Sequence, residues 1–255
     1  MHDCNSSVTP TSTSQTLTGE ASDDSLLDES SSRRYRELVG SLMYLATATR
    51  PDITYAVTQL SKHMMTPAVM HFTAAKHVLR YLRGNTRTLT YARTRPTLEL
   101  VGYVDADWAG DVQTRKSTTG YVFTLGGTAI AWKTKLQPIV ATSSTYAEYI
   151  ASTTAAQEAV ALRRLLITFK LSTDSPTIIH EDNAAALAIS EHHGADHDRS
   201  KHMDVRYHYI RELKLTQQIR VVKIDTASNV ADMFTKGLQR IKHTSFATAI
   251  MGTEQ

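Results

Sequence analysis

Four acidic residues share one unusual position, the junction between an apolar segment and a polar one. Asp105 ends an expected strand over 98–105, and Asp182 follows a short apolar stretch. Glu148 lies on the first turn of an expected long helix, and Asp232 lies near the start of the last helix. A single acid in such a place is usually a turn or cap residue. In a mixed sheet, however, strand ends and helix starts can meet at one edge.

Four carboxylates at one edge would repel each other and raise one another's pKa values. Hard divalent cations with oxygen ligands relieve this repulsion, and Mg²⁺ also binds substrate phosphates. Two such ions a few ångströms apart assist in-line displacement at a phosphodiester. The four acids as a set therefore predict a metal-dependent site for phosphodiester chemistry, which none of them predicts alone.

The elements that must position these acids follow from the periodicity of apolar residues. Residues 33–86 show helical spacing in three segments, interrupted at Pro51 and Pro67, and predict a small helical unit. From about residue 89 the period changes to two, with a hairpin turn at Gly126 and Gly127. We expect strands over 98–105, 118–125, 128–133, 177–180 and 219–224, and helices over about 143–171, 184–190, 201–213 and from 229. This order predicts an α/β fold, a mixed five-stranded sheet with helices on its faces.

The composition is that of a globular protein with room for one or two cores, since 41% of the 255 residues are hydrophobic and 21% are charged. The longest apolar runs are too short for a membrane span, and the first residues lack a signal-peptide pattern. The single cysteine, Cys4, excludes an internal disulfide and fits a reducing, intracellular compartment. Histidines between residues 192 and 208 lack cysteine partners and zinc-site spacing, which disfavours a zinc site.

Charge is unevenly distributed along the chain. Residues 1–32 are rich in Ser and Thr and hold six acids without any Lys or Arg, so we expect a disordered acidic leader. The rest of the chain holds all 28 basic residues and 19 of the 25 acids. This positive excess favours a polyanionic partner, although an ordinary solubilising surface explains it equally well.

Eight sequence blocks carry a resemblance to a known family. The chain contains, in this order, "YRELVGSLMYLATATRPDITYAV", "HVLRYLRGNT", "GYVDADWAGD", "RKSTTGYVF", "SSTYAEYIA", "EDNAAALAI", "SKHMDVRYHYIRE" and "NVADMFTKGL". These blocks resemble the ribonuclease H domain at the end of the Pol polyprotein of copia-type LTR retrotransposons. The resemblance covers roughly residues 33–240.

The resemblance implies a ribonuclease H fold that cleaves the RNA strand of an RNA–DNA hybrid with two Mg²⁺ ions, or with Mn²⁺ as a substitute. The metal-binding acids of the family fall on Asp105, Glu148, Asp182 and Asp232, and Asp105 would bridge both ions. Residues 33–97 would be the thumb and connection part of a reverse transcriptase, 98–240 the nuclease and 241–255 a C-terminal tail. The polymerase domain of the same polyprotein would be the original partner, in an intracellular, virus-like particle setting.

The chain departs from the family pattern at two places. Tyr146 stands where the family usually has Glu, two residues before the expected catalytic Glu148. Cellular ribonucleases H place a His in the loop after the last strand, and the loop over 224–228 offers none. We therefore expect an activity that is modest rather than absent.

Several polar residues near the acids are candidates for contact with nucleic acid, each with a solvated surface as the alternative. They are Arg115, Lys116, Ser117, Thr118, Asn183, Lys201, His202 and Arg206. A basic stripe on the expected helix before residue 84, including His71, His77, Arg80 and Arg83, is a further candidate.

Two other functions remain open at this point. One is a catalytically silent retrotransposon remnant that only binds nucleic acid or acts as a scaffold; the presence of all four acids argues against it. The other is a DNA nuclease or resolvase of the same fold, which the copia-type blocks disfavour. The polymerase-like stretch "YVDAD" is discounted, because Ala106 separates the two acids and the fingers and palm are missing from this sequence.

Overall fold

The structure is a computed structural model, and it describes residues 4–11, 17, 26–91, 98–171, 175–191 and 201–252. The chain forms two compact units. The helical unit comprises residues 1–91 together with 236–255, and the sheet unit comprises residues 92–235. The functional boundaries expected from the sequence, such as 98–240 for the nuclease, stay predictions.

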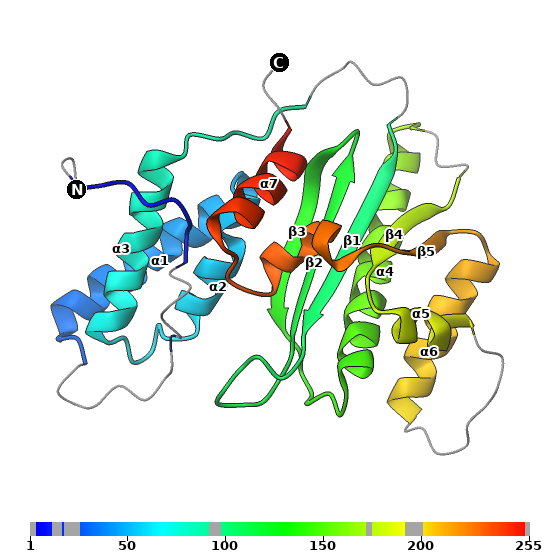
Figure 1. Cartoon of the computed structure of the whole chain (residues 1–255), viewed down its shortest axis with the longest axis horizontal. Coiled ribbons are helices and arrows are strands. Elements are labelled where there is room, and N and C mark those ends of the chain that lie inside the picture. Colours follow the sequence, from blue (N-terminus) through cyan, green and yellow to red (C-terminus); the bar gives the residue numbers. More distant parts are fainter. Residues whose placement is uncertain are drawn as a thin grey trace. The chain divides into compact units, whose positions relative to one another are not determined.

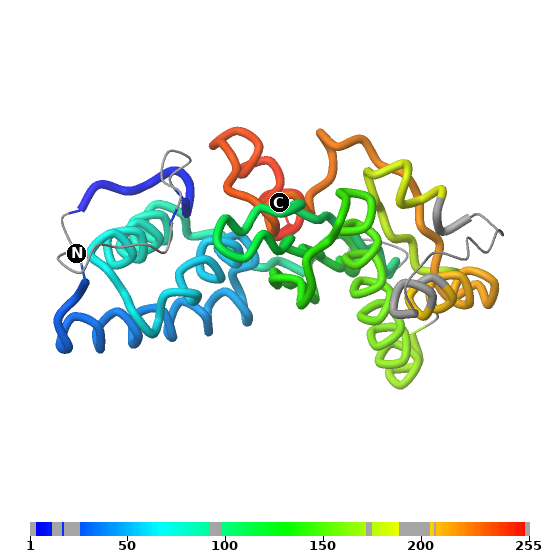
Figure 2. Tube along the Cα trace, turned by 90° about the horizontal axis from the view of Figure 1, so that it is seen from below, coloured from blue at the N-terminus to red at the C-terminus, as the bar shows by residue number. Residues whose placement is uncertain are grey.

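In its described residues, the helical unit contains four α-helices and a short 3₁₀ turn. They are α1 (Glu29–Ala48), η2 (Pro51–Ile53), α2 (Thr54–Ser61), α3 (Val69–Gly84) and α7 (Arg240–Met251). The helices α1, α2 and α3 lie side by side (Figure 2) around one apolar cluster. Asp28 caps α1 by accepting a hydrogen bond from the Ser31 backbone, and Pro51 opens the turn before α2, where its fixed φ suits a helix start.

Residues 4–11 differ from the expected disordered leader. The Ser7 backbone N–H donates to the Arg80 carbonyl (3.1 Å), and the Arg80 guanidinium donates to the Asn5 carbonyl (2.7 Å). The Ser7 hydroxyl lies within hydrogen-bond distance of His77 Nε2 (2.9 Å). Basic side chains of α3 thus pair with backbone groups of this segment and offset the entropy of ordering it. The rest of the leader before residue 26, apart from residue 17, lies outside the described residues.

The same contacts change the interpretation of the basic stripe on α3. His71 is buried, while His77 and Arg80 are engaged with residues 4–11. The stripe therefore serves the internal packing of the helical unit, which disfavours its role as a phosphate-binding face.

The expected C-terminal tail also contains ordered structure, the helix α7. Its buried residues follow the spacing of one helix face: His243, Phe246, Ala247, Ile250 and Met251. The Thr90 N–H donates to the Met251 carbonyl (2.9 Å), and His243 Nε2 lies 3.1 Å from the Asp52 carbonyl oxygen. These contacts attach the end of the described chain to the first helices.

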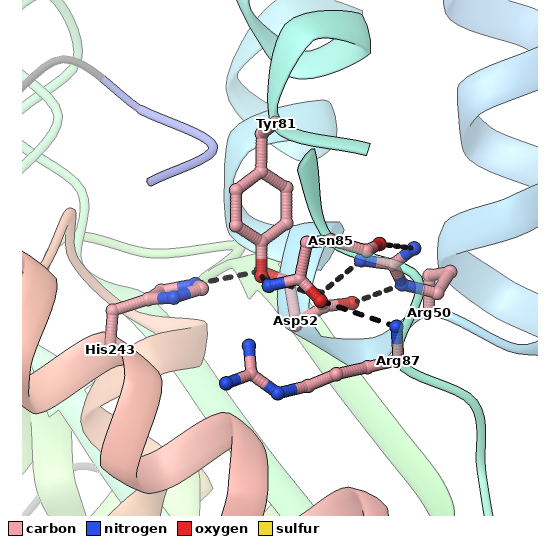
Figure 3. Close-up of polar contacts among 6 residues, drawn as sticks. All are labelled: Arg50, Asp52, Tyr81, Asn85, Arg87 and His243. Carbon is pink, nitrogen blue, oxygen red and sulfur yellow. Dashed lines mark hydrogen bonds and ion pairs between the residues drawn. The ribbon is translucent and has the colours of Figure 1, made fainter. Parts of the chain in front are cut away.

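A buried polar cluster joins η2, α3 and α7 (Figure 3). The guanidinium of Arg50 binds both carboxylate oxygens of Asp52, at 2.8 and 2.7 Å. The Tyr81 hydroxyl donates to the same carboxylate (2.6 Å), and the His243 ring meets the Tyr81 ring edge to face. Because both charges are paired and hydrogen-bonded, the cost of burying them is largely offset.

The sheet unit contains five strands in the order β3-β2-β1-β4-β5 (Figure 1). They are β1 (Leu100–Asp107), β2 (Thr118–Leu125), β3 (Thr128–Leu136), β4 (Thr177–Glu181) and β5 (Ile219–Lys223). The first three are antiparallel, while β4 is parallel to β1 and β5 is parallel to β4. Gly126 and Gly127 both have positive φ, which the tight β2–β3 turn requires. The ribonuclease H-like mixed sheet predicted from the sequence is confirmed.

Three helices accompany the sheet: α4 (Ser144–Thr168), α5 (Ala184–Glu191) and α6 (Lys201–Leu215). Small residues such as Ala147, Ala151 and Ala155 are fully buried on α4 and belong to the same apolar cluster as Val104 of β1, so they let the helix lie close to the sheet. Within the described residues, no helix has both the length and the apolar character that crossing a membrane requires.

The helix expected from residue 229 is instead a 3₁₀ turn, η4 (Val230–Phe234), which follows another short turn, η3 (Thr226–Ser228). The side chain of Asn229 links this turn to β1. Its carbonyl oxygen accepts from the Ala231 N–H (3.1 Å), and its amide donates to the Val104 carbonyl (2.9 Å). A residue tied to β1 in this way fixes the start of the turn.

The stability of the helical unit should depend on the charge of His71. Burial and the stacked His63 ring, 3.9 Å away, lower the pKa of His71 to about 4, against about 6.5 in an unfolded chain. The unfolded state then binds the extra proton first, so this contribution is complete above pH 6.5 and is lost as the pH falls from 6.5 towards 4.

Urea unfolding across this range checks the prediction, with His71→Asn as the matched variant. The Asn side-chain oxygen can replace Nδ1 as acceptor for the Ala68 N–H. We expect a shallower loss of unfolding free energy with falling pH in the variant; an unchanged slope would contradict the prediction.

Candidate metal and catalytic site

Three carboxylates meet at one edge of the sheet. Asp105 lies near the end of β1, Asp182 directly follows β4, and Glu148 lies near the start of α4. Each offers an oxygen atom, and these oxygens all lie within 4.8 Å of one another. The parallel register of β1 and β4, in which Tyr103 pairs with His180, carries both aspartates to the same edge.

The start of α4 is held where Glu148 reaches this edge. The Ser143 hydroxyl caps the helix by accepting from the Tyr146 N–H (3.1 Å). The buried Gln137 amide donates to the Thr119 hydroxyl of β2 (3.0 Å) and to the Ala147 carbonyl of α4 (2.9 Å). The first turn of α4 is thereby fixed to the sheet through a side chain.

The fourth expected acid, Asp232, is fully buried on η4 and is not part of the cluster of three. It is nevertheless connected to it. The Thr235 hydroxyl hydrogen-bonds the Asp105 carboxylate and lies 3.1 Å from the Asp232 carbonyl. Asn229, on the other side of Asp232, binds β1 next to Asp105.

Asn229 and Thr235 are site residues that reasoning from the sequence missed. Both lie in the block "NVADMFTKGL", and their polar side chains flank Asp232 at short spacing. That spacing was the available signal, but it does not reveal which strand the side chains bind.

The cluster is buried on one side and more open on the other. Asp105 and Glu148 are 3% and 7% exposed, whereas Asp182 is partly exposed. Close carboxylates with little access to water repel each other strongly unless a cation lies between them. Carboxylate oxygens are the ligands that hard divalent cations prefer, so the three residues fit a metal ion.

A further acid, Glu181, is buried beside this cluster. Burial raises its pKa to about 8, and the charges of Asp182 and Asp105 add to the rise, while hydrogen bonds from Ser152 and the Asn183 backbone oppose it. Glu181 thus lies in the same electrostatic environment as the three acids but has its own hydrogen-bond partners.

The residues proposed for nucleic-acid contact differ in their accessibility. Arg115 is exposed and Lys116 partly exposed, in the loop between β1 and β2. Ser117 and Thr118 are buried, and the Ser117 hydroxyl accepts from the Ala109 N–H (3.1 Å), so it shapes this loop. Asn183 uses its side-chain oxygen to cap α5, at 3.0 Å from two backbone N–H groups.

The remaining candidates lie on α6. Arg206 is partly buried, and the side chains of Lys201 and His202 lie outside the described residues. Of the candidates with described side chains, only Arg115 is exposed.

The sheet order, with an acidic cluster formed by β1, β4 and the start of α4, defines a ribonuclease H-like domain. The chain is 45% identical over 209 residues to the retrovirus-related Pol polyprotein from transposon TNT 1-94 of Nicotiana tabacum, matching 82% of this chain and 15% of that protein. It is 39% identical over 216 residues to the corresponding protein from transposon RE2 of Arabidopsis thaliana, matching 85% of this chain and 15% of that protein. The chain belongs to the Pol polyprotein family of copia-type retrotransposons.

The chain spans about 15% of the length of these relatives. No family model matches the sequence. Among solved structures, the crystal structure of LC11-RNase H1 in complex with an RNA/DNA hybrid is similar, with a TM-score of 0.39 and 18% identity over 54% of this chain and 94% of that chain.

Divalent cations should stabilise the folded protein through the three carboxylates. A ligand that binds only the folded state at 100 times its Kd adds about 2.7 kcal/mol of stability. We therefore expect Mg²⁺ or Mn²⁺ to raise the unfolding temperature by several degrees. Asp105→Asn should abolish this rise and, without metal, should unfold at a higher temperature than the unchanged protein, because it relieves repulsion.

Thermal unfolding with and without each cation checks this prediction. Glu99→Gln, which removes an exposed acid of the same unit, is the matched control and should keep the full rise. An equal rise in Asp105→Asn and in the unchanged protein would contradict a metal site at the cluster.

Proposed function

We propose that the sheet unit is a ribonuclease H that hydrolyses the RNA strand of an RNA–DNA hybrid with two Mg²⁺ ions, for which Mn²⁺ can substitute. The observation that carries the proposal is the convergence of Asp105, Glu148 and Asp182 in a chain of the copia-type Pol family. The chain matches only part of the length of these Pol polyproteins. The polymerase domain of the same polyprotein is therefore the proposed partner, and residues 33–97 are its proposed thumb and connection segment.

The proposed roles of the acids follow from their positions. Asp105 is the proposed principal metal ligand, and the Thr235 hydroxyl hydrogen-bonds its carboxylate. Glu148 of α4 and Asp182 after β4 would supply two further carboxylates, and Asp232 of η4 would supply the fourth. Divalent cations held here would activate the attacking water and stabilise the leaving 3′ oxygen, which yields 5′-phosphate and 3′-hydroxyl ends.

Substrate binding would rely on the shape of the hybrid and on its 2′-hydroxyl groups rather than on sequence. Arg115 and Lys116 are placed beside the end of β1 and would contact backbone phosphates. Asp182, the most exposed of the three clustered acids, marks the side from which the substrate would approach.

Cleavage of a labelled RNA–DNA hybrid by the purified protein tests the proposal. With Mg²⁺ or Mn²⁺ we expect cuts in the RNA strand. Asp105→Asn and Asp182→Asn should lower the rate by more than the roughly 100-fold that loss of an outer-shell partner costs, because they remove ligands themselves.

Glu99→Gln is the control and should cleave at the unchanged rate. If the protein binds the hybrid without cutting it at high protein concentration, the chain is a silent nucleic-acid-binding remnant. Cleavage of duplex DNA in place of the RNA strand would identify a DNA nuclease of the same fold.

The role of Asp232 can be separated from that of the other acids. Because it lies outside the cluster of three, Asp232→Asn should keep most of the metal-dependent rise in unfolding temperature. It should still lower hybrid cleavage, since the fourth carboxylate would be missing from the reaction. Calorimetric metal titration and a cleavage assay on the same preparation check both parts. Loss of metal binding as complete as in Asp105→Asn would contradict this division.

A further inference from the structure

We propose that Glu181 is a positioning residue that sets the separation of Glu148 and Asp182 by tying α4 to the end of β4. The inference rests on the proposed function, because it assigns to Glu181 a role in holding the metal-binding carboxylates of that site. Glu181 itself is not proposed as a ligand.

Glu181 is hydrogen-bonded to α4, to the turn after β4 and to the residue that follows β5. The Ser152 hydroxyl of α4 donates to one carboxylate oxygen at 2.6 Å. The other oxygen accepts from the Asn183 backbone N–H at 3.2 Å, on the far side of Asp182. The backbone carbonyl of Glu181 accepts from the Ile224 N–H at 3.0 Å, directly after β5. Glu181 is 1% exposed, so these hydrogen bonds are shielded from competing water.

The partners of Glu181 are adjacent to the site acids. Ser152 lies four residues after Glu148, one turn along the same face of α4. Glu181 directly precedes Asp182 in the chain, and Asn183 directly follows it. The single hydrogen bond between Ser152 and Glu181 therefore joins the helix turn that carries one acid to the strand end that carries another.

The turn around Asp182 is fixed from both sides. The Glu181 carboxylate holds the Asn183 N–H, and the Asn183 side chain caps α5 through the N–H groups of Ala185 and Ala186. The backbone on either side of Asp182 is thus held by hydrogen bonds, while its own side chain stays partly exposed for a ligand.

An acid is a costly choice for this position if its only role is to fill space. Burying a carboxyl group carries a desolvation penalty, and the neighbouring Asp182 and Asp105 make it larger. An apolar side chain would avoid both costs, but it could not bind the Ser152 hydroxyl and the Asn183 N–H together. The two oxygens of the carboxyl group connect α4 with the turn.

The test measures metal affinity in Glu181→Ala, Glu181→Gln and Ser152→Ala. The readouts are the Mn²⁺ dissociation constant from calorimetry, the Mg²⁺ concentration for half-maximal hybrid cleavage, and the unfolding temperature without metal. Removing an outer-shell partner of a metal ligand typically weakens metal binding by about 10–100-fold. We expect a weakening of at least about tenfold in Glu181→Ala and little weakening in Glu181→Gln, because its side-chain oxygen can accept from the Asn183 N–H while its amide donates to the Ser152 hydroxyl.

The same experiment separates positioning from a structural role. At saturating Mg²⁺ the maximal cleavage rate should return to within about threefold of the unchanged protein, and the KM for the hybrid should stay the same. Ser152→Ala combined with Glu181→Ala should weaken Mn²⁺ binding no more than Glu181→Ala alone, because both remove one interaction. Thr154→Ala, which removes a local hydrogen bond on the same helix, is the matched control and should bind Mn²⁺ normally.

The outcomes distinguish this inference from the proposed function. If the unchanged protein binds Mn²⁺ but cuts no hybrid, the proposed function fails, and the Mn²⁺ dissociation constants of the variants still decide the role of Glu181. Unchanged Mn²⁺ binding in a folded Glu181→Ala overturns the inference, as does weakening in Thr154→Ala of the same size. If Glu181→Ala does not fold, Ser152→Ala carries the comparison, with Glu181→Gln as its conservative control.

Discussion

The sheet unit depends on one constraint, the repulsion between carboxylates that the strand order brings together. The parallel register of β1 and β4 places Asp105 and Asp182 at the same edge, and α4 adds Glu148 within 4.8 Å. Such a cluster favours any distortion that separates its members. The surrounding structure must resist that distortion when no cation is bound, and yet leave the oxygens reachable. The buried hydrogen bonds around the acids meet this requirement.

Around the acids, neighbouring residues make buried hydrogen bonds that reach other elements. Asn229 and Thr235, on either side of Asp232, bind β1 and the Asp105 carboxylate. Gln137 joins β2 to α4 beside Glu148. Glu181, next to Asp182, binds Ser152 of α4. These hydrogen bonds hold the backbone positions of the acids independently of the metal.

The strands and the three clustered acids could be predicted from the sequence. An alternation of apolar residues and an acid at the end of an apolar run are both local signals. It was not sufficient for the hydrogen bonds that hold the acids in place. Asn229 and Val104 are 125 residues apart, so only the folded structure shows that they are paired. The ordered segment 4–11 was missed for the same reason, since its partner Arg80 is remote. The helix α7 is different. Its apolar residues at 246, 247, 250 and 251 have helical spacing, but the tail was expected because the family blocks end before them.

The placement of α7 makes the helical unit discontinuous in sequence, since the whole sheet unit is inserted between α3 and α7. His243 lies against the Asp52 carbonyl and the Tyr81 ring, next to the buried Arg50–Asp52 pair. A contact between such remote residues carries a loop-closure cost that grows only slowly with the length inserted, whereas its effect on folding rate is larger. The first three helices have their own apolar cluster and a paired Arg50–Asp52, so they can form before α7 arrives. Docking of α7 then completes the surroundings of Asp52 and Tyr81, which makes the polar cluster the point where the two parts of the unit are joined.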